Sequence, residues 1–338
     1  YRGAVFGIGE MLLAGVTTFV DMYYFEDEVA RACVRTGMRG YLGETLISQP
    51  TCDSAQPGGG LEIARRMFDT WRGEALVRPI VAPHGTTTCN EALLRAGVEL
   101  AAGQNALFTL HASEMDYEMK YFAERGETPT RYLKRIGAVN ERLLAGHCIH
   151  LTTDDIEILA EGNAAIAHCI GSNKKAGKGV APMAAAARAG VRFGLGTDGP
   201  SSGNTLSLFD QMRLFADAHK TANRDRALFP AKEIVRAATR GGAQALHAGN
   251  ELGQLRPGLR ADMVLVSVDA PHMFPVYNPY SALVYGANSS DVSLVMVSGE
   301  VLVRGGKLTR LDMEEAKAKL LEQMGPFMQS AAKYADII

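Results

Sequence analysis

The chain has 338 residues, 47% of them hydrophobic and 21% charged, and 35 basic residues nearly balance 37 acidic ones. This composition is typical of a globular enzyme, and without a basic stripe it argues against nucleic-acid binding. No apolar stretch reaches the roughly 18 residues of a membrane span. The five scattered cysteines favour free thiols in a reducing compartment. We therefore expect a cytoplasmic protein that binds neither nucleic acid nor membrane.

The chain opens inside a helical pattern, without an initiator methionine. Ile8, Met11, Leu12 and Val16 form an apolar face, and the strand-like run TTFV follows. This pattern predicts that the chain enters its fold midway.

Seven short apolar or β-branched runs then recur, each followed by a helical pattern. The runs are TTFVDM, RGYLGE, VRPIVAPH, ALFTLHASE, RLLAGHCIH, AAIAHCI and VRFGLGTDG. The helical patterns lie near residues 26–36, 60–71, 90–103, 115–137, 152–162, 181–190 and 204–222. Apolar strands that alternate with helices indicate a parallel sheet buried on both faces. Seven strands fit either a doubly wound open sheet or a (β/α)8 barrel that lacks one strand.

The polar residue at the end of each run favours the barrel. These residues are Asp21, Glu44, His84, His111, His147, His168 and Asp198. In a barrel the carboxyl ends of all strands meet at one rim, where such enzymes hold their active sites. An open sheet would usually carry a glycine-rich phosphate loop after its first strand, and the sequence has none there. We therefore expect an α/β fold, a TIM-like barrel without its first strand.

The alternation ends near residue 250. The segments GQLRPGLRADMVLVSVDAP and VSLVMVSGEVLVRGGKL are strand-and-turn patterns, in which SGE and RGGK read as hairpin turns. A charged amphipathic helix is expected from Met313 to Tyr334. The predicted organisation is a barrel over 1–250, a small β-sandwich domain over 251–310, and a C-terminal helix over 311–338.

His111 and Glu114 are the first candidates for chemistry. His111 ends an apolar strand, and Glu114 lies three residues further on. Neutral imidazole is a common zinc ligand, and a nearby carboxylate is suited to shuttling protons. The alternative is a buried histidine bonded to backbone. The other strand-end histidines leave similar choices open: His168 is either a loop-organising histidine or a substrate contact.

Asp198 is the stronger signal. It follows a mostly apolar run and is flanked by glycines, in a place where an unpaired buried charge is costly. The alternative is a turn or helix-capping aspartate, but the sequence GPSSGN intervenes, so capping is assigned to Ser202 or Asn204. Histidines on neighbouring strands make a divalent metal the natural partner for Asp198.

Together these motifs resemble the amidohydrolase superfamily, in its 5'-methylthioadenosine/S-adenosylhomocysteine deaminase branch. AGVTTFVDMYYF is similar to the second strand of that family, APHGTTTCN to its fourth-strand motif, LHASE to the fifth, AGHCIHL to the sixth, AHCIGSNKKAGKGVAP to the seventh and GTDGPSSGN to the eighth. Each motif alone is weak, but the set in this order is specific, and it covers nearly the whole chain.

The resemblance implies the role of each residue. His111 and Asp198 would bind one divalent metal, zinc with Fe²⁺ or Mn²⁺ as alternatives. Glu114 would shuttle the proton, His147 would contact the attacking water or the substrate, and Asp198 would pass a proton to departing ammonia. Substrate-binding roles fall to His84, His168, Asn173 and Asn204. A small-molecule substrate, an adenine-type nucleoside, and a homo-oligomeric enzyme are expected.

Two departures leave alternatives open. The H-x-H metal ligands of the family would precede Tyr1, and the family's Pro-Tyr after the fourth-strand histidine is replaced by Gly85 and Thr86. One alternative is an amidohydrolase acting on another aminated ring, such as guanine, a pterin or a chlorotriazine. The other is a non-catalytic remnant that lacks the H-x-H ligands.

Overall fold

The computed structural model describes residues 1–331, and all seven strands expected for the barrel are present. The run VRPIVAPH forms two short pieces, β3 and β4, which both pair with β2. The strands are β1 (Thr18–Tyr23), β2 (Arg39–Leu46), β3 (Val77–Pro79), β4 (Ala82–Pro83), β5 (Phe108–Ala112), β6 (Leu143–His147), β7 (Ala165–His168) and β8 (Arg192–Leu195).

Every pairing among β1 to β8 is parallel. One group runs β1–β2–β3/β4 and the other β5–β6–β7–β8. Two isolated parallel bridges, Val81 to Phe108 and Gly85 to His111, join the groups. Within the described residues β1 pairs only with β2 and β8 only with β7. This parallel strand order is the one the barrel prediction requires, with β1 and β8 as the edges of the described sheet.

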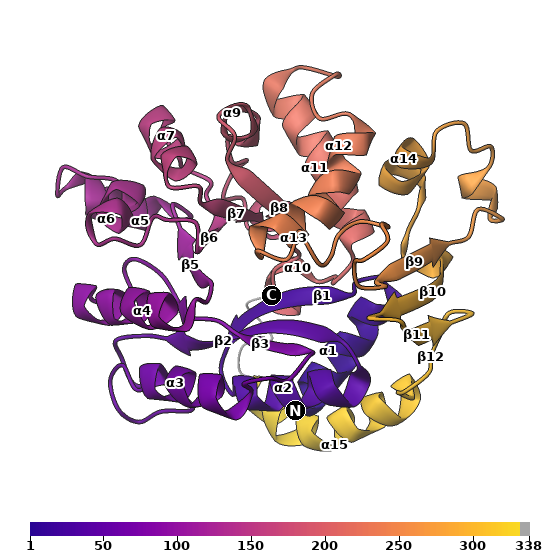
Figure 1. Ribbon diagram of the computed structural model, residues 1–338, viewed down its shortest axis with the longest axis horizontal. Helices are drawn as coiled ribbons and strands as arrows, with labels where there is room; N and C mark the ends of the chain where they lie inside the picture. The colour runs from indigo at the N-terminus through magenta and orange to yellow at the C-terminus, as the bar shows by residue number, and fades with distance from the viewer. Residues whose placement is uncertain (332–338) are drawn as a thin grey trace.

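Helices lie around this sheet, most of them on its outer side (Figure 1). They are α1 (Arg2–Leu13), α2 (Glu26–Thr36), α3 (Gly60–Thr70), α4 (Glu91–Gln104), α5 (Asp116–Ala123), α6 (Pro129–Arg135), α7 (Thr153–Glu161), α8 (Ile170–Lys175), α9 (Met183–Arg188), α10 (Pro200–Gly203), α11 (Leu208–Asn223), α12 (Ala231–Arg236) and α13 (Gly242–Ala245). Side chains of the helices and strands share one large hydrophobic cluster, as parallel strands covered by helices should.

Local signals explain several helix boundaries. Asn90 caps α4 by accepting a hydrogen bond from the backbone N–H of Leu93, and Thr152 forms a capping box with Asp155 at the start of α7. The expected cap at Ser202 or Asn204 is wrong. Ser207 caps α11, because GPSSG forms the separate short helix α10 first.

Two other sequence expectations needed correction. The single helical pattern over 115–137 is divided into α5 and α6, since Gly126 between them has φ of 72° and ends the helical path. The short helix α8, directly after β7, was not anticipated, because its few residues are too short for a periodic pattern.

The β-rich tail forms an antiparallel sheet in the order β12–β11–β10–β9. Its strands are β9 (Met263–Val266), β10 (Val292–Val297), β11 (Glu300–Arg304) and β12 (Lys307–Leu308), and the predicted turns SGE and RGGK separate the last three. A loop with the short helix α14 (Pro279–Ser281) separates β9 from β10. The division into domains at residues 250 and 310 stays a prediction.

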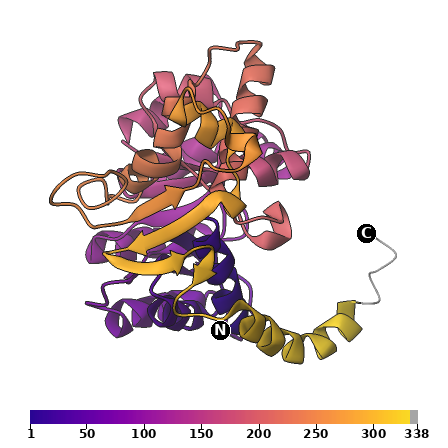
Figure 2. The same cartoon turned by 90° about the vertical axis from the view of Figure 1, so that its right-hand side faces the viewer.

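The last described helix, α15 (Met313–Ala331), begins where the sequence predicts. The remainder of the expected helix, to Tyr334, lies outside the described residues. Figure 2 shows α15 extending to one side of the molecule, past the antiparallel sheet. Arg2 at the start of α1 pairs with Glu322 of α15 at 2.9 Å, which ties α15 to the first helix. No helix within residues 1–331 has the length and apolar character needed to cross a membrane.

Candidate active site

The strand-end residues lie together at the carboxyl end of the parallel sheet, as the barrel topology requires. His84 follows β4, His111 is in β5 and His147 ends β6. The His84 and His111 ring centres are 5.0 Å apart, and those of His111 and His147 are 5.2 Å apart. Three neighbouring strands therefore hold three imidazoles in a row.

His111 presents one ring nitrogen for a ligand. Its Nδ1 lies 2.7 Å from the carbonyl oxygen of His84, so the ring is oriented by the backbone of the neighbouring strand. Burial, and then nearby His147 and His84, lower the pKa of His111 to about 4. His111 is therefore a neutral imidazole at neutral pH. Its Nδ1 contact fits the pattern in which a ligating histidine donates its second N–H to a carbonyl.

Glu114 lies in the loop after β5, against three other side chains. Its Oε1 is 2.5 Å from the Lys178 ammonium and 3.6 Å from Nε2 of His147. Its backbone N–H donates to Glu118 Oε2 at 2.8 Å. Burial raises the pKa of Glu114, but His147 and the hydrogen bond from Lys178 lower it by more, so that the pKa lies below its usual range. Glu114 is thus an ionised carboxylate, ready to accept a proton.

His147 is the buried centre of the group. Its side chain is only 3% exposed, and its Nε2 is 4.0 Å from Asp198 Oδ2 as well as close to Glu114. Its Nδ1 lies 2.8 Å from the side-chain oxygen of Asn173, which is fully buried in α8. Asn173 therefore orients the His147 ring from the side opposite Glu114 and Asp198, which lie near Nε2.

Asp198 follows β8 and has φ of 61°, in the left-handed region that aspartate enters more readily than most residues. Its Oδ1 accepts a hydrogen bond from the N–H of Gly199 at 2.7 Å, and its side chain is 24% exposed. It caps no helix, because the N-cap of α10 is Gly199 and that of α11 is Ser207. The capping alternative is therefore wrong for Asp198.

The remaining predicted substrate contacts are arranged differently. His168 is fully buried at the end of β7, with its Nε2 3.0 Å from Nε2 of His219 in α11. Burial, and then the neighbouring His219, lower the pKa of His168, so the ring is neutral. His84 is partly exposed and bonds Thr88 at 2.9 Å. Asn204 is the C-cap of α10, in the segment that follows β8. Substrate contact by these residues stays a prediction.

Sequence reasoning missed Lys178, Glu118 and His219. Lys178 carried a signal, since it stands between two glycines in the segment KKAGKG, in the loop after the seventh strand. Glu118 and His219 carried none, because each is an ordinary residue within a helical pattern. Only the packing of α5 and α11 against the strand ends brings them near the site.

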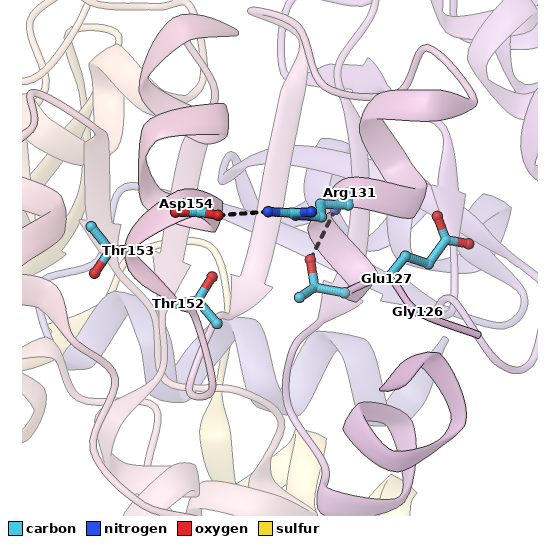
Figure 3. A pocket seen from close by; sticks show the side chains of 7 residues that line it. Gly126, Glu127, Arg131, Thr152, Thr153 and Asp154 are labelled. Atoms are coloured by element: carbon cyan, nitrogen blue, oxygen red, sulfur yellow. Dashed lines mark hydrogen bonds and ion pairs between the residues drawn. The ribbon is translucent and has the colours of Figure 1, made fainter. Parts of the chain in front are cut away.

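Figure 3 shows a cavity that is separate from this histidine group. It has a volume of about 420 Å³ and is lined by Gly126, Glu127, Thr128, Arg131, Thr152, Thr153 and Asp154. In Figure 3 the Arg131 side chain reaches across it to Asp154, and the two atoms that join them are 2.5 Å apart. None of the candidate site residues lines it.

The donor set fits a divalent metal as part of a ligand shell. His111 contributes a neutral, oriented imidazole, and Asp198 contributes a carboxylate whose Oδ2 is near the same group. Catalytic zinc normally takes three protein ligands. Among residues 1–331, no group of three or more histidine, cysteine, aspartate or glutamate side chains is arranged to hold a metal. Metal binding by His111 and Asp198 stays a prediction.

Comparison with known proteins identifies the class. The model of the amidohydrolase family matches residues 1–302. The chain therefore belongs to the amidohydrolase family and is an enzyme of that family.

Relatives within the family carry more particular names. The chain is 39% identical to 5-methylthioadenosine/S-adenosylhomocysteine deaminase 1 of Syntrophus aciditrophicus over 316 residues, which are 93% of this chain and 71% of that protein. It is 35% identical to the 5-methylthioadenosine/S-adenosylhomocysteine deaminase of Thermoanaerobacter pseudethanolicus, with 93% of this chain and 73% of that protein covered.

Solved structures agree with the fold and bear on the metal. An adenosine deaminase from Xanthomonas campestris with bound zinc is 32% identical, with a TM-score of 0.92 over 95% of this chain and 73% of that one. Atrazine chlorohydrolase of Arthrobacter aurescens, complexed with zinc, is 26% identical, with a TM-score of 0.88 over 95% of this chain and 76% of that one. The barrel prediction is confirmed, and a divalent metal is supported for this chain.

Proposed function

We propose that this chain carries out the metal-dependent hydrolytic deamination of an adenine-type nucleoside: 5'-methylthioadenosine, S-adenosylhomocysteine or adenosine. The observation that carries the proposal is that His147 lies 3.6 Å from Glu114 and 4.0 Å from Asp198, beside the oriented His111. The names of the relatives and of the zinc-bound adenosine deaminase support the same substrate class.

A single divalent ion, zinc with Fe²⁺ or Mn²⁺ as alternatives, is part of the proposal. His111 and Asp198 would contribute to holding it, and no lysine ends β4 to bridge a second ion. When bound, such an ion lowers the pKa of a coordinated water to about 7 and so supplies hydroxide near neutral pH.

The side chains supply the proton transfers. Glu114, kept ionised by its neighbours, would accept the proton of the attacking water and deliver it to the ring nitrogen beside the amino-bearing carbon. His147, held by Asn173, would hydrogen-bond the attacking oxygen. Asp198 would pass a proton to the leaving amine. The balance is water added at the carbon and ammonia released, which leaves a ring carbonyl.

The substrate-facing loop after β4 departs from the family pattern at Gly85 and Thr86, and this favours one second candidate. An amidohydrolase of another aminated or chlorinated ring, such as guanine, a pterin or a chlorotriazine, fits the likeness to atrazine chlorohydrolase. We also propose a cytoplasmic, homo-oligomeric enzyme.

The test is product release from a panel of substrates by the zinc-loaded protein in its full natural length. We expect ammonia from adenosine, methylthioadenosine or S-adenosylhomocysteine. Ammonia from guanine or a pterin alone, or chloride from a chlorotriazine, would select the second candidate. No product from any of them, with zinc bound, would favour the non-catalytic alternative.

A further inference from the structure

One charged side chain at the site has no part in the roles above. Lys178 lies in the loop between α8 and α9, and its Nζ is 2.5 Å from Glu114 Oε1. The two side chains are only 21% and 15% exposed. We propose that Lys178 is a positioning residue, which holds the Glu114 carboxylate in the orientation needed for proton transfer. The inference rests on the proposed function, in which Glu114 carries the proton.

The loop is built to hold Lys178 in this place. Gly177 has φ of 66° and Gly179 has φ of 118°, conformations that residues with side chains rarely adopt. A Cβ on Gly179 would also lie 3.2 Å from the Ile149 side chain. The backbone N–H of Lys178 donates to the carbonyl of Asn173 at 2.9 Å. Lys178 therefore differs from a surface lysine, since its backbone is bent toward the site and tied there.

The same loop also orients the residue opposite Lys178. Asn173, which accepts from the Lys178 backbone, uses its side chain to hold His147 at 2.8 Å. His147 and Lys178 then meet the same atom of Glu114, Oε1. The segment 173–178 therefore positions both side chains that lie against the Glu114 carboxylate, His147 and Lys178.

These contacts leave the two carboxylate oxygens of Glu114 in different surroundings. Glu118 fixes the Glu114 backbone, and Lys178 takes Oε1 in a charge-assisted hydrogen bond. Among the hydrogen bonds of the described residues, none goes to Glu114 Oε2. Oε2 is therefore the oxygen left to exchange a proton with the substrate, and without Lys178 the carboxylate is able to rotate away from that position.

Lys175 provides a matched control. It lies in the same lysine-rich segment, but its Nζ donates to the carbonyl of Ser201 at 3.2 Å and it is exposed. A general effect of positive charge near the site would therefore appear in Lys175→Met as well as in Lys178→Met. An effect through Glu114 would appear only in Lys178→Met.

The kinetic test compares kcat and KM on the substrate that the panel identifies. Lys178→Met should lower kcat about 10-fold and change KM less than about two-fold, because a misplaced catalytic group costs stabilisation of the transition state rather than binding of the substrate. Lys178→Arg should recover most of kcat, since a guanidinium also makes a charge-assisted bond. A rise in KM alone, or an equal loss in Lys175→Met, would overturn the proposal.

A second measurement needs no turnover. After reductive methylation with ¹³C, which keeps the lysine charge, the Lys178 signal should move in Glu114→Gln while the Lys175 signal stays in place. An unmoved Lys178 signal would show that the contact does not exist in solution. If the wild type releases ammonia from no substrate, the proposed function is wrong, and this signal still decides whether Lys178 holds Glu114.

Discussion

At the scale of single residues, the site depends on backbone conformations that are uncommon for residues other than glycine. His147 and Asp198 both have positive φ, at 64° and 61°. Such conformations cost roughly 1–3 kcal/mol each and persist only where the surrounding structure enforces them. Here Asn173 holds the His147 ring and Gly199 donates to Asp198. The backbone strain is thus found at His147 and Asp198, whose side chains lie 4.0 Å apart at the strand ends.

Glu114→Gln should keep the fold and the bound metal but lower kcat at least ~100-fold, because the amide neither accepts nor delivers the proton. The measurements are steady-state kinetics, metal content and thermal unfolding. Glu74→Gln, at a partly exposed carboxylate in the loop after α3, serves as the control. Turnover within a few-fold of the wild type would remove Glu114 from the mechanism.

Asp198→Asn preserves the shape of the side chain but weakens it as a metal ligand and removes a proton carrier. Metal content after dialysis and kcat should therefore both fall, while the unfolding temperature of the metal-free protein stays close to that of the wild type. If metal occupancy and kcat both stay at the wild-type level, Asp198 is only a turn residue.

At the scale of elements, a buried ion pair joins the parallel sheet to the antiparallel one. Arg39 of β2, which is fully buried, contacts Asp262 just before β9 at 2.5 Å, and Asp262 is 8% exposed. Arg39 also donates to Thr18 at 2.9 Å. Removing one member leaves the other charge buried without compensation, so the pair matters more for stability than an exposed pair would.

Asp262→Ala should lower the free energy of unfolding by about 3–5 kcal/mol. Glu251→Ala, which removes the partner of the more exposed Arg78, should cost at most about 1 kcal/mol. Urea denaturation of both variants makes the comparison. Equal losses in the two variants would mean that burial of Arg39 does not control the effect.

The carboxyl ends of β1 and β2 hold carboxylic acids that are costly to ionise. Burial raises the pKa of Glu44 to about 8 and that of Asp21 to about 6. Both folded values lie above the unfolded ones, so the folded state binds these protons more tightly and protonation stabilises it. This stability is fully present below the unfolded pKa values and is lost as pH rises through the folded ones.

The free energy of unfolding should therefore fall between about pH 4.5 and about pH 8 through Glu44, with Asp21 contributing up to about pH 6. Glu44→Gln does not titrate, and it should lose less stability than the wild type between pH 5 and pH 8.5. Urea denaturation at the two pH values measures this. An identical loss in both proteins would show that Glu44 ionises normally when folded.

At the scale of the whole molecule, the site and the core are separate. The candidate ligands are at the carboxyl ends of the strands, whereas one large hydrophobic cluster between strands and helices supports the fold. A metal at the site is therefore expected to matter for chemistry more than for folding.

Treatment of the full-length enzyme with a chelator should abolish ammonia release and leave a cooperative unfolding transition. Added zinc should restore the rate, because the ion supplies the hydroxide at neutral pH. The rate and the unfolding curve are to be measured on the same samples. Full activity after the metal content has fallen to background would exclude metal-dependent deamination.

The strand order and the position of the chemistry were within reach of the sequence. Each strand is a short apolar run, and each of the polar residues that end these runs marks the carboxyl end of its strand, so that the parallel arrangement alone brings His111, His147 and Asp198 to one edge. The family motifs added the roles of these residues, because the same residue types stand in the same order.

Only the tertiary structure decided which side chains act on one another. Lys178 meets Glu114 across 64 positions of the chain, and His168 meets His219 across 51. The same is true of Ser207, which caps α11 because GPSSG coils into a helix of its own. Local periodicity carries no information on such contacts, since they depend on how the loops and helices pack over the strand ends. The sequence therefore determined the scaffold and the chemical groups, and the packing decided which partner sets the orientation and charge of each group.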